Sequence, residues 1–329
     1  MKKSIQGLYL ASLGALGTLA VVLRTVSLLV GFDFSTGYFT DKLLNNVSAI
    51  IAAVAVVIFV TFLIYKKDYK PRVGIGTARD YVSSACVGVA LIIMAFDIAA
   101  TALSNSGVAK PQAIENVITA IAALLAAAAA FYFVFSVAFG KGAPLASATF
   151  SIALMLYLIF YALLLYFNAS TPLNAPVKLC DQMAYAALAI FFVYETRISL
   201  ARPMWRMYVV SGLSATLLAA YSAIPSLIVY FVRGEVISHT ISETILTLSL
   251  FIFALVRTVS ALFAEEDCKN RVVEFIRKMH TERTKEIDEA RAARAHYNNN
   301  EENGEEENDN YEIELPKPSD NDATERAEP

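Results

Sequence analysis

The sequence has few of the side chains from which metal sites and catalytic centres are built. Its 329 residues include only three histidines, and two of these fall in a charged C-terminal stretch. His239 is then alone in the apolar part of the chain, so a zinc, haem or di-iron centre cannot be assembled. The G-x-S-x-G, H-E-x-x-H and P-loop patterns are also missing. We therefore expect no metal, no cofactor and no enzymatic activity.

Cysteine is equally scarce, with three residues in the whole chain. If the N-terminus lies inside the cell, Cys86 lies near the inner face, Cys180 near the outer face and Cys268 in the cytoplasm. Two cysteines form a disulfide only when their Cα atoms come within about 7 Å. We therefore expect all three thiols to be free.

Charged residues make up only 17% of the chain, whereas hydrophobic residues make up 57%. Ordinary globular domains contain about 45–50% apolar residues. The composition therefore indicates a membrane protein. The basic residues do not alternate with aromatic ones on a soluble face, so we expect no nucleic-acid partner.

Long apolar runs dominate the first 264 residues, and each is long enough to cross a bilayer. Backbone groups in lipid must be hydrogen-bonded internally, so the runs are predicted to be helices. The fold class is then an all-α, polytopic membrane bundle with eight transmembrane helices. The predicted spans are residues 5–30, 44–65, 81–103, 113–139, 144–167, 179–201, 207–232 and 241–263.

The connections between these runs predict the orientation of the bundle. With the N-terminus inside, the inner connections hold eleven Lys and Arg residues and the outer ones four. Cytoplasmic loops carry the excess of basic residues, so we expect both termini in the cytoplasm and a cell-membrane location.

The chain becomes strongly charged after the last apolar run. Residues 265–297 balance acids and bases and predict a charged cytoplasmic helix. Residues 298–329 hold 12 acidic and 2 basic side chains with almost nothing apolar to bury, so we expect a disordered acidic tail. Such a tail could recruit a cytoplasmic protein.

Two pairs of charged residues fall inside the apolar runs. Arg24 and Asp97 each lie six residues from the outer end of their helix, so they share one depth and are predicted to pair. Glu195 and Arg257 are predicted to pair near the inner face by the same reasoning. Each pair is either a structural ion pair or part of a solute or proton path.

The seventh run carries the most hydroxyl groups and the only intramembrane proline. These residues either line a path or hydrogen-bond between helices. The candidates for path lining are Ser211, Ser214, Tyr221, Ser222 and Pro225.

Four predicted helices begin on the outer side with an acidic residue nearby. Together the four could collect cations, but an acid at a helix N-terminus also stabilises the helix dipole without any ligand. The four acids are Asp41, Glu115, Asp181 and Glu243.

The loop F-D-F-S-T-G-Y-F, which follows the arginine-bearing first helix, resembles segments of uncharacterised multispanning inner-membrane proteins of bacteria. The resemblance covers some twenty residues and implies only a bacterial inner-membrane setting. Two functional hypotheses remain open: a small-solute or ion permease, and a non-transporting scaffold or sensor subunit that binds a partner through its tail. The oligomeric state cannot be read from the sequence.

Overall fold

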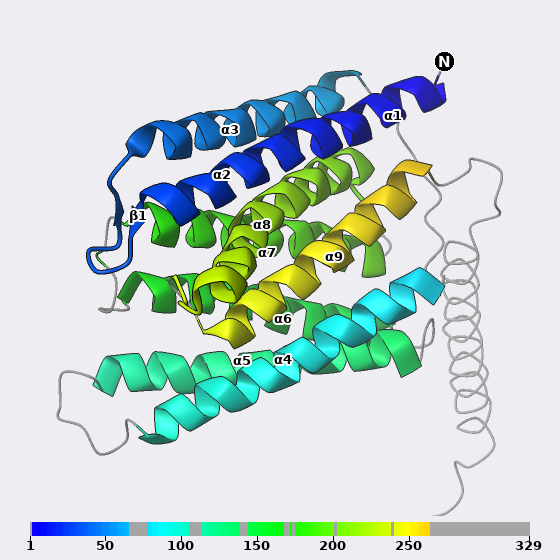
Figure 1. The fold of residues 1–329 in the computed structure, drawn as a ribbon. Coiled ribbons are helices and arrows are strands. Elements are labelled where there is room, and N and C mark those ends of the chain that lie inside the picture. The colour runs from blue at the N-terminus through cyan, green and yellow to red at the C-terminus, as the bar shows by residue number, and fades with distance from the viewer. Residues whose placement is uncertain are drawn as a thin grey trace, which may run out of the picture. The chain divides into compact units, whose positions relative to one another are not determined.

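The computed structural model describes residues 2–65, 78–104, 113–138, 144–167, 172, 175–200, 203–237 and 240–263. The regular elements among these residues are helices, apart from one short β-hairpin (Figure 1). The predicted charged helix at 265–297 and the predicted acidic tail at 298–329 lie outside the described residues.

The described helices agree with the predicted spans to within a few residues at each end. Their bounds are α1 Lys2–Ser12, α2 Thr18–Gly31, α3 Lys42–Tyr65, α4 Ala78–Ser104, α5 Ala113–Ala138, α6 Pro144–Phe167, α7 Pro176–Ser199, α8 Trp205–Arg233 and α9 Ile241–Phe263.

The first predicted span is continuous but contains a π-helical turn, η1 Leu13–Gly17, between α1 and α2. Such turns insert an extra residue into a helix and are frequent at functional sites. A Cβ atom at Gly17 would stand 3.2 Å from the side chain of Leu217, so the glycine allows η1 and α8 to approach closely.

A two-stranded hairpin joins α2 to α3. Strand β1 (Phe32–Asp33) pairs antiparallel with β2 (Tyr38–Phe39), and Gly37 adopts a φ of 74° in the turn, which glycine tolerates without a Cβ clash. The Asp33 carboxylate accepts hydrogen bonds from the backbone N–H of Ser35 and from the hydroxyls of Ser35 and Thr36. We call this end of the bundle the hairpin end.

These hydrogen bonds lower the pKa of Asp33 below its ordinary value, with the Ser35 hydroxyl as the largest cause. A depressed carboxyl pKa adds stability that is present above the unfolded-state pKa and lost as pH falls through the folded-state pKa. The turn is therefore expected to loosen only in strongly acidic solution. Carboxyl ¹³C titration should show the Asp33 pKa rising when Ser35 and Thr36 are replaced by Ala and Val. An unchanged pKa in that variant would contradict the assignment.

Helices α4 to α9 form a ring in which each helix packs against the next and α9 packs against α4. Helices α2 and α3 pack on each other and on α8. Accordingly, α2 and α3 lie on one side of the molecule and α4 and α5 on the other, with α8 between them (Figure 1). Because α8 has neighbours on both sides, most of its residues are buried.

Seven of the described helical segments are long and apolar enough to span a membrane, consistent with a multi-pass membrane protein. The described apolar part of α5, Val117–Phe133, is shorter than a span. The structure therefore supports seven spans, and the predicted eighth is not confirmed. Many large apolar side chains, such as Val30, Phe96 and Leu103, are exposed, which suits contact with lipid.

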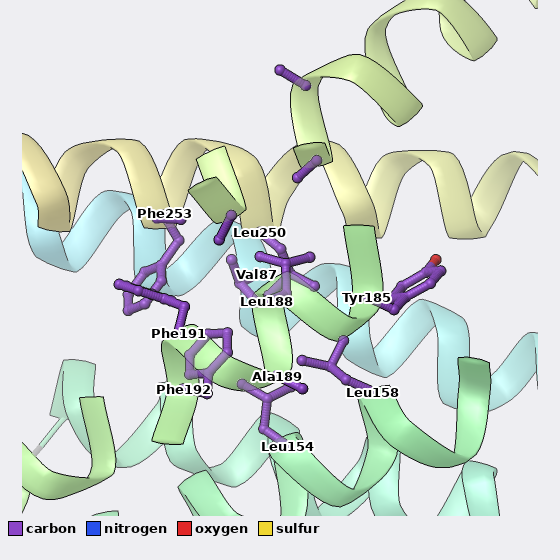
Figure 2. Packing of buried hydrophobic residues seen from close by; sticks show 14 of the residues in the cluster. Val87, Leu154, Leu158, Tyr185, Leu188, Ala189, Phe191, Phe192, Leu250 and Phe253 are labelled. Atoms are coloured by element: carbon purple, nitrogen blue, oxygen red, sulfur yellow. The ribbon is translucent and has the colours of Figure 1, made fainter. Parts of the chain in front are cut away.

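The ring is filled by a layer of large apolar side chains (Figure 2). Phe192 stacks on Phe253 with ring centroids 5.7 Å apart, and Phe133 meets Phe253 edge to face at 5.3 Å. Leu188 and Leu250 continue this layer towards Tyr185. The layer separates two groups of buried polar residues.

Candidate functional site

The buried polar residues of α7, α8 and α9 gather at two levels. Asp181 and Glu195 on α7, Ser222 and Tyr208 on α8, and Glu243 and Arg257 on α9 are all buried. On each helix the two residues are 14 positions apart, which is nearly four helical turns or about 21 Å. Each of these three helices therefore presents one polar residue near the hairpin end and one near the opposite end.

The opposite-end cluster is built on Arg257. Its Nε and Nη2 both donate to Oε1 of Glu195, at 3.1 and 2.5 Å, and its Nη1 lies 3.8 Å from Asp80 Oδ1. All three side chains are almost fully buried. This is a closed ion pair with a second, more distant carboxylate.

Two tyrosines complete the opposite-end cluster. Tyr132 of α5 and Tyr208 of α8 are buried and close enough to interact electrostatically with Glu195 and Arg257. Four helices therefore contribute dipoles or charges around one guanidinium, which offsets part of the cost of removing the charge from water.

The hairpin-end cluster is built on Arg24 of α2. Its guanidinium lies over the ring of Tyr221, with Cζ 4.5 Å from the ring centroid. The Tyr221 hydroxyl shares a 2.7 Å hydrogen bond with the hydroxyl of Ser48 on α3. Asp181 interacts electrostatically with Arg24 and accepts a short hydrogen bond from Ser222. The cluster thus joins α2, α3, α7 and α8.

A polar extension of this cluster reaches α9 and α4. Tyr185 of α7 shares a 2.9 Å hydrogen bond with Thr247, whose hydroxyl also donates to the backbone carbonyl of Glu243. Glu243 in turn interacts electrostatically with Asp97 and with the buried Tyr157. Polar groups therefore run across the bundle at this level.

The structure does not bring Arg24 and Asp97 together, contrary to the prediction. Helix α2 packs on α3 and α8, whereas α4 packs on α5 and α9, so the two residues lie on opposite sides of α8. Asp97 instead lies close enough to the carboxylate of Glu243 for the two like charges to repel each other. The other predicted pair, Glu195 with Arg257, is brought together at 2.5 Å.

The five residues proposed to line a path on α8 have different surroundings. Tyr221 and Ser222 belong to the hairpin-end cluster. Ser211 is buried and donates to the backbone carbonyl of Tyr208, and Ser214 is half-buried. Pro225 is buried inside the helix, one turn beyond Tyr221.

The four acids proposed to collect cations do not share one role. Asp41 is exposed and accepts a hydrogen bond from the backbone N–H of Leu43, as a helix-terminal acid does. Asp181 and Glu243 are buried, and the side chain of Glu115 lies outside the described part.

Apolar side chains close the hairpin-end cluster on the side nearest the hairpin. Leu28 follows Arg24 by one turn on α2, Val177 precedes Asp181 by one turn on α7, and Val229 follows Ser222 by two turns on α8. These three pack with Phe32 and Phe39 of the hairpin and with Ile237. The polar cluster is thus enclosed between this apolar plug and the aromatic layer of the ring.

Within the described ranges, no group of three or more His, Cys, Asp or Glu residues could hold a metal ion. Cys86 and Cys180 are both free thiols there, whereas Cys268 and His239 lie outside the described residues. Comparisons of the chain with protein-family models, with curated proteins and with solved structures found no match.

Proposed function

We propose that the protein is a small-solute permease of the cell membrane, with the hairpin-end cluster as its solute site. The observation that carries the proposal is a buried, charged cluster enclosed between an apolar plug and an aromatic layer. Charged residues inside a membrane bundle are costly and commonly mark solute or ion paths. A site closed on both sides matches the occluded state of an alternating-access cycle.

The opposite-end cluster supports this assignment because it joins two helices on the far side of the aromatic layer. A closed Arg257–Glu195 pair holds α7 against α9 at the far side of the aromatic layer. Opening a path to that side requires this contact to loosen, so it would act as a gate. We place the hairpin end outside, α5 as an eighth span and both termini in the cytoplasm, as the distribution of basic residues favours.

Helix α8 is the element that would move. It packs against α2, α3, α7 and α9, and it carries Pro225 in its interior. Proline removes one backbone hydrogen bond and is a common point of helix bending. Bending at Pro225 would shift Val229 of the apolar plug relative to Ser222.

Thiol labelling of a variant that lacks Cys86, Cys180 and Cys268 tests this proposal without knowledge of the solute. A cysteine in place of Ser222 should react with a charged, impermeant methanethiosulfonate added outside, because the open state exposes it transiently. An open state populated at about 0.1–10% gives a rate roughly 10- to 1,000-fold below that of a cysteine at Ser35 in the exposed turn.

A cysteine in place of Val57 on α3 is the matched control, because Val57 is exposed on an apolar helix and should face lipid. A cysteine at Ser211 should react from the cytoplasmic side. If the cysteines at Ser222 and Ser211 stay as unreactive as that at Val57 while Ser35 reacts fully, the bundle is static. The alternative, a scaffold or sensor subunit that binds a cytoplasmic protein through its tail, would then be favoured.

A further inference from the structure

We propose that the hairpin-end cluster binds its solute through a carboxylate group, which the guanidinium of Arg24 holds. The carboxylate would bind at the same site as in the proposed function. Binding does not require that function, but transport of the bound solute does. The basis of the proposal is the contrast between two arginines in the same bundle.

Arg24 and Arg257 are equally buried, at 2% and 3% exposed, but their hydrogen bonding differs. Arg257 uses its Nε and Nη2 on Glu195. The Nε of Arg24 is buried and has no hydrogen-bond acceptor in the described part of the chain. The neighbouring Asp181 acts on Arg24 electrostatically, and its Oδ1 accepts the short hydrogen bond from Ser222.

A purely structural role leaves this donor without compensation. Leaving a buried donor unsatisfied costs about 1–3 kcal/mol, and more when the group is charged. In the opposite-end cluster, by contrast, the Nε of Arg257 donates to the carboxylate of Glu195 and so joins α9 to α7. A buried arginine whose Nε is left open is therefore better explained by a ligand that completes its hydrogen bonds.

The form of the guanidinium specifies the ligand. Tyr221 occupies one flat face of the group, and the Nε–H on its edge has no acceptor in the described part of the chain. The N–H pair formed by Nε and one Nη matches the two oxygens of a carboxylate. Phosphate would fit the same edge, but it carries more negative charge beside the fixed carboxylate of Asp181.

The residues beside Arg24 favour a small solute. Asp181 already lies close to the guanidinium, so a ligand with a single carboxylate adds less negative charge there than a more highly charged anion would. The hydroxyls of Ser48 and Ser222 donate to the Asn45 carbonyl and to Asp181, so they can only accept hydrogen bonds from the rest of a short solute.

Thermal unfolding of the full-length protein in detergent tests the inference with three probes of similar size. The probes are propionate, which carries only a carboxylate, alanine, which carries a carboxylate and an ammonium, and propylamine, which carries only an ammonium. At about 100 times its Kd, a bound probe should raise the Tm by roughly 5–10 °C. We expect propionate, alanine or both to do so, and propylamine and an equal concentration of sodium chloride to have no effect.

The probe that raises the Tm identifies the kind of carboxylate that the site binds. A shift with propionate indicates a site for simple organic acids, and a shift with alanine alone indicates a site in which Asp181 holds the ammonium of an amino acid. Either result supports the proposal. Absence of a shift with both carboxylates, or an equal shift with sodium chloride, overturns it.

Arginine variants test whether the rise in Tm depends on Arg24. R24Q should abolish the shift, and R24K, which keeps the charge but loses the N–H pair, should weaken binding by about 10-fold or more. R233Q is the matched control, because Arg233 also stacks on an aromatic ring at the hairpin end, 5.3 Å from the centroid of Phe34, but is exposed. A shift that survives in folded R24Q, or that is lost in R233Q as well, contradicts the assignment to Arg24.

Failure of this inference can be told apart from failure of the proposed function. Carboxylate binding that depends on Arg24, in a protein whose cysteine at Ser222 never reacts, would establish the site but not transport. A reactive cysteine at Ser222 without carboxylate binding would leave a permease for another class of solute.

Discussion

Replacing Glu195 with Gln is expected to lower the free energy of unfolding by about 3 kcal/mol, because it leaves the guanidinium of Arg257 buried without its principal counterion. The loss should be at the lower end of the range for broken buried pairs, since Asp80 remains 3.8 Å from Arg257. For a chain of this size, the Tm should fall by roughly 6–12 °C. Thermal unfolding in detergent, followed by the fluorescence of Trp205, measures the change.

A double-mutant cycle separates the ion pair from general packing. Arg257→Met alone should also destabilise the protein, because it leaves Glu195 buried without its guanidinium. The double variant Glu195→Leu/Arg257→Met should lose less than the sum of the two single variants, since it removes both charges together. Simple additivity would mean that the two groups do not stabilise each other.

The matching depth of Glu195 and Arg257 could be predicted from the sequence, but which helices lie side by side could not. Counting residues from helix ends places Arg24 level with Asp97 and Glu195 level with Arg257. Only the second pair meets, because α2 and α4 lie on opposite sides of α8. Helix adjacency depends on how all the surfaces pack together, and a single sequence with polar residues on several helices does not specify it.

Two buried acids lie deeper in their helices than the predicted spans imply. A span that begins at residue 179 puts Asp181 in the first turn, yet α7 begins at Pro176. Asp181 therefore lies within the helix and is fully buried beside Arg24. A span that begins at residue 81 leaves Asp80 outside, although α4 begins at Ala78 and buries it.

A signal for Asp181 is nevertheless present in the sequence. Pro176 favours the first helical position, so it could move the predicted start of α7 by one turn. The tyrosines of the opposite-end cluster have no comparable signal, because tyrosine is common both in apolar cores and at membrane interfaces.

Replacing Gly212 with Ala is expected to destabilise the bundle by about 3 kcal/mol, because α8 and α9 touch at this glycine. A Cβ atom there would overlap Oγ1 of Thr258, and it would lie 3.2 Å from the Cβ of Thr258 and 3.3 Å from the ring of Phe191. Rotating the threonine side chain can move Oγ1 away but leaves the contact with its Cβ, so α8 and α9 must move apart by a few tenths of an ångström. The expected fall in Tm, roughly 6–12 °C, is measured as for Glu195.

Gly7→Ala is the matched control for this substitution. Gly7 lies in α1, and no atom stands within 4 Å of the place that a Cβ would take, so alanine there should be neutral or slightly stabilising through its helix propensity. The double variant Gly212→Ala/Thr258→Ala should regain part of the loss, because it removes the hydroxyl that the new methyl group meets. If Gly212→Ala is as stable as Gly7→Ala, α8 and α9 are not in close contact at this point. If the double variant regains nothing, the strain comes from the Cβ at position 258 or from Phe191 and not from the Thr258 hydroxyl.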